Sequence, residues 1–514
     1  MMLPLAPLLL VLAGAYYLLR PVGGPPRRSG LAEIVSLVAL GIAVTCVVHL
    51  VAVGPATLSY GHAGWLSLRL DAVSATMLLL VTFVGWIVMR YARTYLDGEP
   101  REAVFHGLML ATLAAVSLLV VSGGFVVLVI AFMAIGLCLR ALLLFYPRRP
   151  EARRAATKFT LIWGASDVVL IGAAVLFLVD LGTVGFARLV DLAGSGLSPV
   201  GQAAVFLLML GAVMKTAVFP LHGWLTEVME APTPVSALLH AGIINSGGFL
   251  LIRLADVVQA SAGAMAVLVM LGGFTALFGA VVMLTQSAIK TALAWSTISQ
   301  MGFMLLQCGL GLWPIALLHI VAHSLYKAHA FLASGKAVRA VSAIRRPGPV
   351  ATPSPGAVAR AFALALVLLG VVAVAFGVVI GPKPPQAYAL GAILIFGVAY
   401  LVAQGLADAA PAALTQRTAV ASLAAAFGYF TFQLIAVMLW GGQLPAPPAP
   451  GALEWAMIIV ALISFGLVAV AQSLFPLWAH HPATAGLRVH LVNGLYLNTL
   501  LDRLIGGLRF VKQS

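Results

Sequence analysis

Residues 207–224 read LLMLGAVMKTAVFPLHGW, an apolar stretch in which Lys215 stands five residues before Pro220. A proline lacks a backbone N–H and clashes with the preceding helical turn, so it predicts a helix break. A charge at bilayer depth costs about 2.5–3.5 kcal/mol on insertion scales. Free backbone groups at that depth are tolerated only beside protein or a water-filled cavity. The stretch therefore predicts a discontinuous membrane helix, broken near Pro220, whose lysine lies on an ion path.

The composition of the whole chain indicates a lipid environment. Its 514 residues are 62% hydrophobic and only 9% charged, whereas a soluble domain has about 25% charged residues. The apolar runs have the length that crosses a bilayer as a helix, and strand-length alternating segments are not expected. We predict an all-α polytopic membrane protein of about 14–15 transmembrane helices. The predicted spans lie near residues 3–20, 31–54, 72–90, 104–121, 124–146, 157–180, 200–220, 232–253, 262–286, 290–309, 313–335, 358–380, 388–409, 419–440 and 453–478.

The distribution of basic residues predicts the orientation. Cytoplasmic loops carry an excess of lysine and arginine, and this explains the net charge of +14 better than nucleic-acid binding does. Three alternate loops are strongly basic, which predicts a multi-pass protein of the inner (plasma) membrane with its N-terminus outside. These loops hold Arg90, Arg93 and Arg101; Arg148, Arg149, Arg153, Arg154 and Lys158; and Lys336, Arg339, Arg345 and Arg346. The intervening loops hold fewer, namely Arg69, Arg188, Arg253 and Lys383.

Proline-rich segments predict how the chain is divided. The basic segment SAIRRPGPVATPSPGAV separates a core from a C-terminal set of helices. The leucines and charges of the tail predict an amphipathic segment that lies on the cytoplasmic face or docks on a partner. The predicted units are N-terminal transmembrane helices at 1–60, a core at 61–340, a cytoplasmic loop at 341–357, C-terminal transmembrane helices at 358–480 and the tail at 481–514.

Four charged residues fall inside the predicted spans: Arg140, Asp167, Lys215 and Lys327. Asp167 lies near the middle of TLIWGASDVVLIGAAVLF, residues 160–177. Asp167 and Lys215 have two interpretations, an ion path or a salt bridge that only holds two helices together, and the two are compatible. Arg140 is close to the end of its span, so its side chain is expected to reach the cytoplasmic edge.

A second polar group occurs in HIVAHSLYKAHAFLASGK, residues 319–336. His319, His323 and Lys327 are spaced four apart, so they share one face of a helix. Histidine titrates near neutral pH, and a desolvated lysine becomes a usable proton carrier. The stripe predicts a proton relay, with polar packing between helices as the alternative. His329 is off the stripe and is interpreted as structural.

Two further residues complete the candidate set. Pro232 and Pro234 in MEAPTPVSALLHAGIINSGGFLLIR, residues 229–253, suit a helix start. They place His240 in the following helix, where it would bridge the two lysine regions. Lys290, at the start of KTALAWSTISQMGFM, is either a charge that sets topology or a relay member. No residue pattern predicts a metal site, a cofactor or a catalytic nucleophile.

Three segments together resemble the antiporter-like subunits of respiratory complex I and the Mrp cation/proton antiporters. They are KTAVFPLHGWLTEVMEAPTPVSALLHAGIINSGGF (215–249), IKTALAWSTISQMGFM (289–304) and HSLYKAHAFLASG (323–335), within a match over roughly 60–340. The first segment resembles in particular the DabB-type subunit of two-component inorganic-carbon transporters. That family works with a zinc-containing partner, DabA, which resembles a β-carbonic anhydrase.

The resemblance carries over at four positions and departs at others. Lys215 matches the family's lysine of the broken helix, His240 the residue on the next helix, Lys327 the later lysine and Asp167 a membrane acid. Met133 stands where complex I subunits carry a glutamate that pairs with the broken-helix lysine, which leaves Asp167 as the best partner for Lys215. The later helices offer only Gln404 and Asp408 where the family carries a lysine or glutamate. The long lateral helix of the largest complex I subunit is also not expected.

The resemblance implies a transporter subunit rather than an enzyme acting alone. It would conduct H⁺ or Na⁺ across the lipid bilayer and energise bicarbonate or CO₂ uptake in a hetero-complex with the DabA-type zinc partner. The expected cation path is Asp167, Lys215, His240, Lys290, His319, His323 and Lys327. The alternatives are a subunit of a respiratory or hydrogenase-linked complex or of a Mrp-type antiporter, and a scaffold that only anchors the partner. Buried charges argue against the scaffold, because an anchor does not need them.

Overall fold

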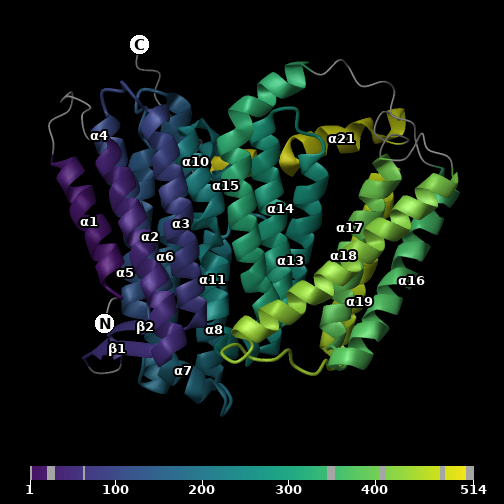
Figure 1. Ribbon diagram of the computed structural model, residues 1–514, viewed down its shortest axis with the longest axis horizontal. Coiled ribbons are helices and arrows are strands. Elements are labelled where there is room, and N and C mark those ends of the chain that lie inside the picture. The colour runs from purple at the N-terminus through teal and green to yellow at the C-terminus, as the bar shows by residue number, and fades with distance from the viewer. Residues whose placement is uncertain are drawn as a thin grey trace.

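The computed structural model describes residues 3–19, 29–61, 64–343, 354–405, 411–474, 478 and 481–504. Helices run back and forth between two opposite rims (Figure 1). We call the rim that holds residues 54–71, 182–198 and 254–261 the hairpin rim. We call the opposite rim, with residues 96–101, 144–149 and 284–288, the basic rim. Because the helices alternate in direction, the predicted basic loops that the structure describes lie on one side.

The prediction of a polytopic helical membrane protein is confirmed. In the described part of the chain, eleven helices are long and apolar enough to cross a membrane, and three shorter apolar helices accompany them. Within the described residues, each of the fifteen predicted spans coincides for most of its length with a helix or a broken helix. In the core these are α1 (Leu5–Leu18), α2 (Ser29–Val53), α3 (Ala72–Tyr95), α4 (Glu102–Val120), α5 (Phe125–Leu143), α6 (Pro150–Leu181), α8 (Pro199–Lys215), α10 (Thr233–Ala241) with α11 (Ser246–Arg253), α13 (Ala262–Met283), α14 (Ile289–Gly309) and α15 (Trp313–Ala343).

Two core spans are broken. α8 ends at Lys215 and the chain becomes helical again in α9 (Gly223–Glu227). The predicted helix 232–253 begins as expected, with Pro234 in the first turn of α10, but a 3₁₀ turn at Ile243–Asn245 separates α10 from α11. This second break was not predicted. In the α10–α11 span, 94% of the residues of an 18-residue apolar window are buried, so its non-helical backbone is surrounded by protein, as a membrane-depth break requires.

A two-stranded antiparallel hairpin corrects the expectation of a chain without strands. β1 (Ala56–Tyr60) pairs with β2 (Leu66–Leu70), with Leu58 opposite Leu68. Each strand has only five residues, but β2 reads LSLRL, and this alternation of apolar and polar residues is a strand signal in the sequence. A bridge from Leu68 to Ser122 ties the hairpin to the α4–α5 connection.

A buried ion pair at the hairpin rim joins the start of α3 to the end of α11. Asp71 caps α3 by accepting the backbone N–H of Ser74 at 2.8 Å. Its second oxygen accepts from Arg253 Nη1 at 2.6 Å and lies 2.8 Å from Arg69 Nε. Arg253, expected to be a loop charge, is in fact buried at the end of α11, with its side chain 2% exposed. The pair therefore fixes the end of the central span against α3.

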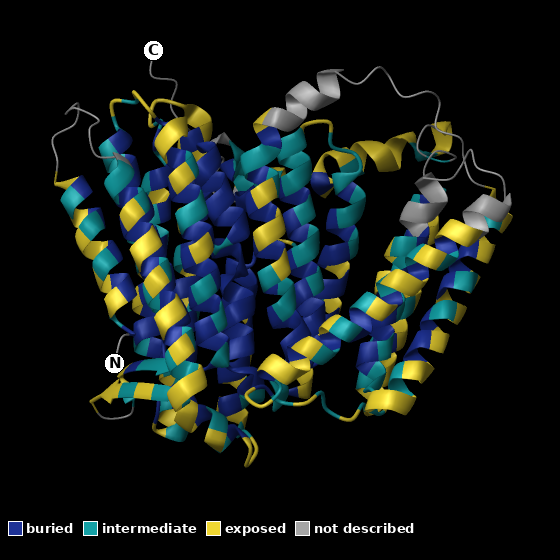
Figure 2. Cartoon of the chain, in the orientation of Figure 1, coloured by how far each residue is buried: buried dark blue, intermediate teal, exposed yellow. Residues whose placement is uncertain are grey.

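Four C-terminal helices form a second, more exposed layer (Figure 2). They are α16 (Pro355–Ile380), α17 (Pro385–Gly405), α18 (Pro411–Trp440) and α19 (Ala452–Ser473). α18 runs diagonally toward the core (Figure 1), and Trp440 Nε1 donates to Thr76 Oγ1 of α3 at 3.0 Å. Gln443 Oε1 accepts from the N–H of Ala72 at 2.7 Å. The layer is thus anchored to the start of α3.

Short helices complete both rims. α7 (Phe186–Ala193) and α12 (Ala255–Gln259) lie at the hairpin rim, and α21 (Ala485–Val492) and α22 (Leu497–Leu504) lie at the basic rim. Residues 344–353 of the predicted proline-rich loop lie outside the described residues, as does Asp408. The side chain of Gln404 is likewise not described.

Candidate functional site

Lys215 and Asp167 are brought together at the first helix break. Lys215 is the last residue of α8 and is fully buried, and its Nζ lies 2.7 Å from Asp167 Oδ1 on α6. The same ammonium group lies 3.4 Å from the carbonyl oxygen of Trp163. A buried charge persists only with such partners. Asp167, which the sequence suggested as the best partner of Lys215, therefore does lie beside it.

Aromatic rings enclose the rest of the lysine head. Lys215 Nζ lies 4.0 Å from the ring centroid of Trp163 and 4.4 Å from that of Phe132, within the range of a cation–π contact. The Trp163 ring packs in turn on Phe159 and Trp224, with centroids 5.1 and 6.1 Å away. This aromatic layer separates Lys215 from the basic rim. Among the described residues, Asp167 is the carboxylate that contacts the lysine.

Lys215 is paired with Asp167 although Met133 stands where the resemblance implies a glutamate. Met133 is 47% exposed, on the outer stripe of α5 with Leu137 and Arg140. The neighbouring residue Phe132 is the one that faces Lys215. The α5 side chain at position 133 thus points away from the lysine in this protein.

The break after α8 begins earlier than the sequence predicts. The predicted span runs to Pro220, but the last helical residue is Lys215. The next residue, Thr216, donates its hydroxyl hydrogen bond back to the Ala212 carbonyl at 2.5 Å. Ala217 has a φ of +52°, a left-handed conformation that is uncommon for residues other than glycine. The lysine therefore sits at the helix end itself, and Pro220 lies within the connection to α9.

His240 occupies the end of α10, beside the second break. Its Nδ1 lies 3.0 Å from Thr297 Oγ1 of α14, and its ring stacks on Phe331 of α15 with a centroid distance of 4.3 Å. His240 is fully buried. It therefore joins the α14–α15 side of the core, and the described contacts link it to the Lys327 region rather than to Lys215.

The predicted stripe on α15 forms as expected, and each member has a polar partner on another element. His319 Nδ1 lies 3.0 Å from Gln307 Oε1, and His323 Nδ1 lies 3.2 Å from Asn245 Oδ1. The two imidazole rings are 6.0 Å apart. Lys327 Nζ donates to Ser296 Oγ at 2.8 Å and to the Leu293 carbonyl at 3.2 Å.

Several partners in this network were not singled out from the sequence as functional. Asn245 lies at the end of the second break, where its amide also donates to Ser324 Oγ at 3.0 Å. Ser296, Thr297 and Gln307 are among the polar residues of helix α14. Their presence within one predicted membrane span is the sequence signal that could have identified them.

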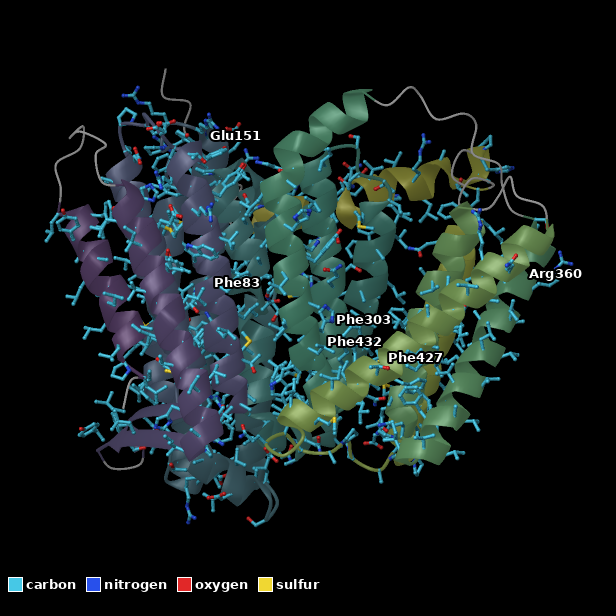
Figure 3. The ribbon with its side chains drawn as sticks, in the orientation of Figure 1. Phe83, Glu151, Phe303, Arg360, Phe427 and Phe432 are labelled. Atoms are coloured by element: carbon cyan, nitrogen blue, oxygen red, sulfur yellow. The ribbon has the colours of Figure 1, made fainter. Side chains whose placement is uncertain are left out.

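A cavity of about 670 Å³, largely open at the protein surface, adjoins the histidines. Phe303 of α14 and Phe432 of α18, labelled in Figure 3, line it together with His319 and His323. The Nε2 atoms of His323 and His240 are buried and have no hydrogen-bond partner among the described residues. Each is a buried polar atom of the kind that a bridging water commonly satisfies.

Three other predicted residues are placed as follows. Lys290 lies half-buried at the start of α14, at the basic rim, and makes no hydrogen bond or ion pair within the described ranges. His329 is exposed, away from the stripe. Lys158, grouped in the sequence with the basic loop, is instead in the third turn of α6 and fully buried, in contact with Glu227.

Comparison with known families places these residues in a matched region. The model described as "NADH:quinone oxidoreductase/Mrp antiporter, TM" matches residues 122–406. The model described as "NADH-Ubiquinone oxidoreductase (complex I), chain 5 N-terminus" matches residues 64–106. Together they include both broken spans and the α15 stripe.

Curated relatives of two kinds are similar to the chain. The probable inorganic carbon transporter subunit DabB2 of Halothiobacillus neapolitanus is 36% identical over 451 residues, which are 85% of this chain and 80% of that protein. The probable subunit DabB of Hydrogenovibrio crunogenus is 44% identical over 52% of each chain. NADH-quinone oxidoreductase subunit L of Escherichia coli is 34% identical over 53% of this chain and 45% of its own length. The chain thus spans about half the length of the last two.

Solved structures share the fold. A chain of the Mrp complex from Dietzia sp. DQ12-45-1b has a TM-score of 0.59 and 23% identity, and the match covers 100% of this chain and 57% of that one. A chain of respiratory complex I from Thermus thermophilus has a TM-score of 0.57 and 21% identity, with 96% and 99% covered. At these identities the likeness concerns the fold alone.

Proposed function

Because the chain belongs to the NADH:quinone oxidoreductase/Mrp antiporter family, we propose that it conducts H⁺ or Na⁺ to energise inorganic-carbon uptake. The names of its DabB relatives support the carbon-uptake part of this proposal. In this role it works as a membrane subunit with a DabA-type zinc protein, and the basic rim faces the cytoplasm. The N-terminus then lies outside the inner membrane.

The observation that carries the proposal is the buried Lys215–Asp167 pair at a broken helix. A fixed structural pair is replaceable by apolar residues with little loss of stability, and often with a gain. A pair that moves charge is not replaceable, because its protonation or separation is the function. The lysine is the last residue of α8, so a shift of this helix end would separate the ammonium group from the carboxylate.

The second part of the path is the His240–His323–Lys327 network, with His319 at the cavity and Lys290 at the basic rim. The unpartnered Nε2 atoms of His240 and His323 support water-bridged proton transfer between them. A proton reaching this network adds positive charge beside Lys327. Coulomb repulsion in a low-dielectric interior then favours release of a proton from the lysine or onward along α15.

The cavity between α15 and α18 supports an exit at the outer half of the path. It adjoins His319 and His323, and this region lacks the additional lysine or glutamate that the complex I pattern would supply. In this chain the imidazoles of His319 and His323 therefore carry the proton where the complex I pattern has a lysine or glutamate. The departure fits a subunit that delivers charge to a different partner.

Growth rescue tests the proposal. The chain is expressed in a carbonic-anhydrase-deficient bacterium, alone and with its genomic neighbour, and growth in ordinary air is measured. We expect rescue only with both proteins, abolished by an uncoupler. Absence of rescue, with both proteins present in the membrane, contradicts the carbon-uptake function.

Charge-removing variants test the path itself. We expect Lys215→Ala to reduce labelled-bicarbonate uptake at least 10-fold, and Lys383→Ala at the hairpin rim serves as the control. The double variant Lys215→Met/Asp167→Asn leaves no unpaired charge, so it keeps its fold. If it retains uptake, the pair only holds α6 to α8 and the conduction role is wrong.

A respiratory or Mrp-type role is the second candidate, favoured by the 34% identity to NADH-quinone oxidoreductase subunit L. The genomic neighbours separate the two. Subunits with iron–sulfur motifs favour the respiratory complex, and a single large zinc-site protein favours carbon uptake.

A further inference from the structure

The C-terminal segment folds back over the basic rim of the core (Figure 1). We call residues 485–504, which comprise α21 and α22, the strap. The carbonyl oxygen of Val492 accepts a hydrogen bond from Gln286 Nε2 at 3.3 Å. Gly494 packs on the ring of Trp295, where a β-carbon would lie 3.0 Å from the indole. The strap is therefore seated on the end of α13 and on α14.

A single buried lysine binds the far end of the strap. Lys158 Nζ donates to Glu227 Oε1 of α9 and to Asn498 Oδ1 of α22, the latter at 2.6 Å, and lies 2.6 Å from Asp502 Oδ1. Asn498 Nδ2 also donates to Glu227 Oε1 at 2.8 Å. The Lys158 side chain is 0% exposed, against 30% for Asp502. One cation thus holds three elements together, α6, α9 and α22.

The strap touches the rim half of the broken helix directly. Gly223, the first residue of α9, has no side chain, and a β-carbon there would overlap the amide oxygen of Asn498. The next residue, Trp224, packs on Trp163, whose ring lies 4.0 Å from Lys215 Nζ. From the basic rim toward Lys215, the order is therefore the strap, then α9, then the aromatic layer.

We propose that the strap is a lid over the basic-rim entrance to Lys215, latched by Lys158, and that it must lift from α9 for ions to pass. This inference rests on the proposed conduction. The latch consists of the charged groups of Lys158, Glu227 and Asp502 at the basic rim. When the strap separates from α9, water can solvate these charges. The contact of Gly494 with Trp295 remains, and the strap turns about this contact when α22 lifts.

The first experiment measures lid movement without ion flux. Cys46, Cys138 and Cys308 are replaced by serine, and a reporter cysteine is placed beneath the strap by His222→Cys. His222 is buried, with its ring 5.0 Å from that of Trp295. We expect Asp502→Asn to raise the rate of labelling by an impermeant thiol reagent at least 10-fold. Arg503→Gln, on the exposed face of α22, is the matched control. Equal rates in the two variants overturn the latch.

The second experiment closes the lid with a disulfide. An ideal β-carbon on Gly223 lies 3.5 Å from Asn498 Cβ, within the range that a disulfide bridges. We expect the oxidised double variant Gly223→Cys/Asn498→Cys, reconstituted in liposomes, to conduct at under a tenth of the rate of its reduced form. Equal conduction in both forms overturns the lid. If neither form conducts and the parent protein is also silent, the proposed conduction fails, and the labelling rates still decide the lid.

Discussion

At the scale of single residues, two buried ion pairs lie where a membrane helix ends. Lys215 meets Asp167 at the end of α8, and Arg253 meets Asp71 at the end of α11. Breaking a buried ion pair by removing one partner costs about 3–5 kcal/mol, because the other charge stays buried. Removal of one partner from either pair is therefore expected to destabilise the protein, and the second pair has only a structural role in our proposal.

Asp71 gives a prediction about stability and pH. Burial raises the pKa of the Asp71 carboxyl, but Arg253, Arg69 and the Ser74 hydrogen bonds together bring it below its usual value. A lowered folded-state pKa stabilises the protein above the unfolded pKa of about 3.9, and this contribution is lost as pH falls through the folded value. We expect Asp71→Asn to lower the melting temperature at pH 7, by a margin that shrinks below about pH 4.

The measurement is thermal unfolding in detergent across this pH range. Asparagine still caps α3, so the effect reports the lost charge. Asp191→Asn, at an exposed position of α7 on the same rim, is the control and leaves the melting temperature unchanged. A pH-independent effect of Asp71→Asn contradicts the assignment.

At the scale of elements, α11 depends on two adjacent glycines with different neighbours. A β-carbon on Gly247 would overlap the Ala212 carbonyl and the Thr216 hydroxyl, next to Lys215. A β-carbon on Gly248 would instead meet the flexible end of Met304. A methionine side chain can move aside for an added methyl group, but a backbone carbonyl cannot. The two positions therefore differ in how well they accept a side chain, although they are neighbours in the sequence.

We therefore expect Gly247→Ala to displace the end of α8 and Gly248→Ala to be accommodated. The readouts are the yield of folded protein after detergent extraction and uptake with the partner. Gly247→Ala should reduce both several-fold, while Gly248→Ala should stay within twofold of the parent. Equal behaviour of the two variants would show that α8 and α11 do not pack as described.

The sequence predicted the membrane spans well because each is a long apolar run. It missed the turn at Ile243–Asn245, because no proline marks that break, and the stability of such a turn comes from neighbours such as Ser324. It also misplaced Lys158 and Arg253 among the loop charges. Their burial depends on Asp502 and Asp71, which are distant in the sequence. The α15 stripe was predictable because helical spacing alone defines it.

At the scale of the whole molecule, the two rims differ in charge. The positive-inside rule assigns the basic rim to the cytoplasm, and this gives a topology prediction. Single cysteines at Tyr60, 65% exposed in the hairpin, and at Glu151, exposed at the start of α6, report the two sides.

We expect Tyr60→Cys to react with an impermeant maleimide in intact cells stripped of the outer membrane, and Glu151→Cys to react only after permeabilisation. Both variants are made in the background without native cysteines. Reversed labelling would place the basic rim outside and reverse the direction of the proposed path.

The contacts between α18 and α3 also have a consequence in time. The partner of the Ala72 amide, Gln443, is 371 residues further along the chain. At a synthesis rate of about 5–20 residues per second, it emerges some 20 to 75 s after α3. The first helices therefore reside in the bilayer unfinished, with the start of α3 uncovered, until α18 arrives. The translation of the last quarter of the chain thus completes the assembly of its first quarter.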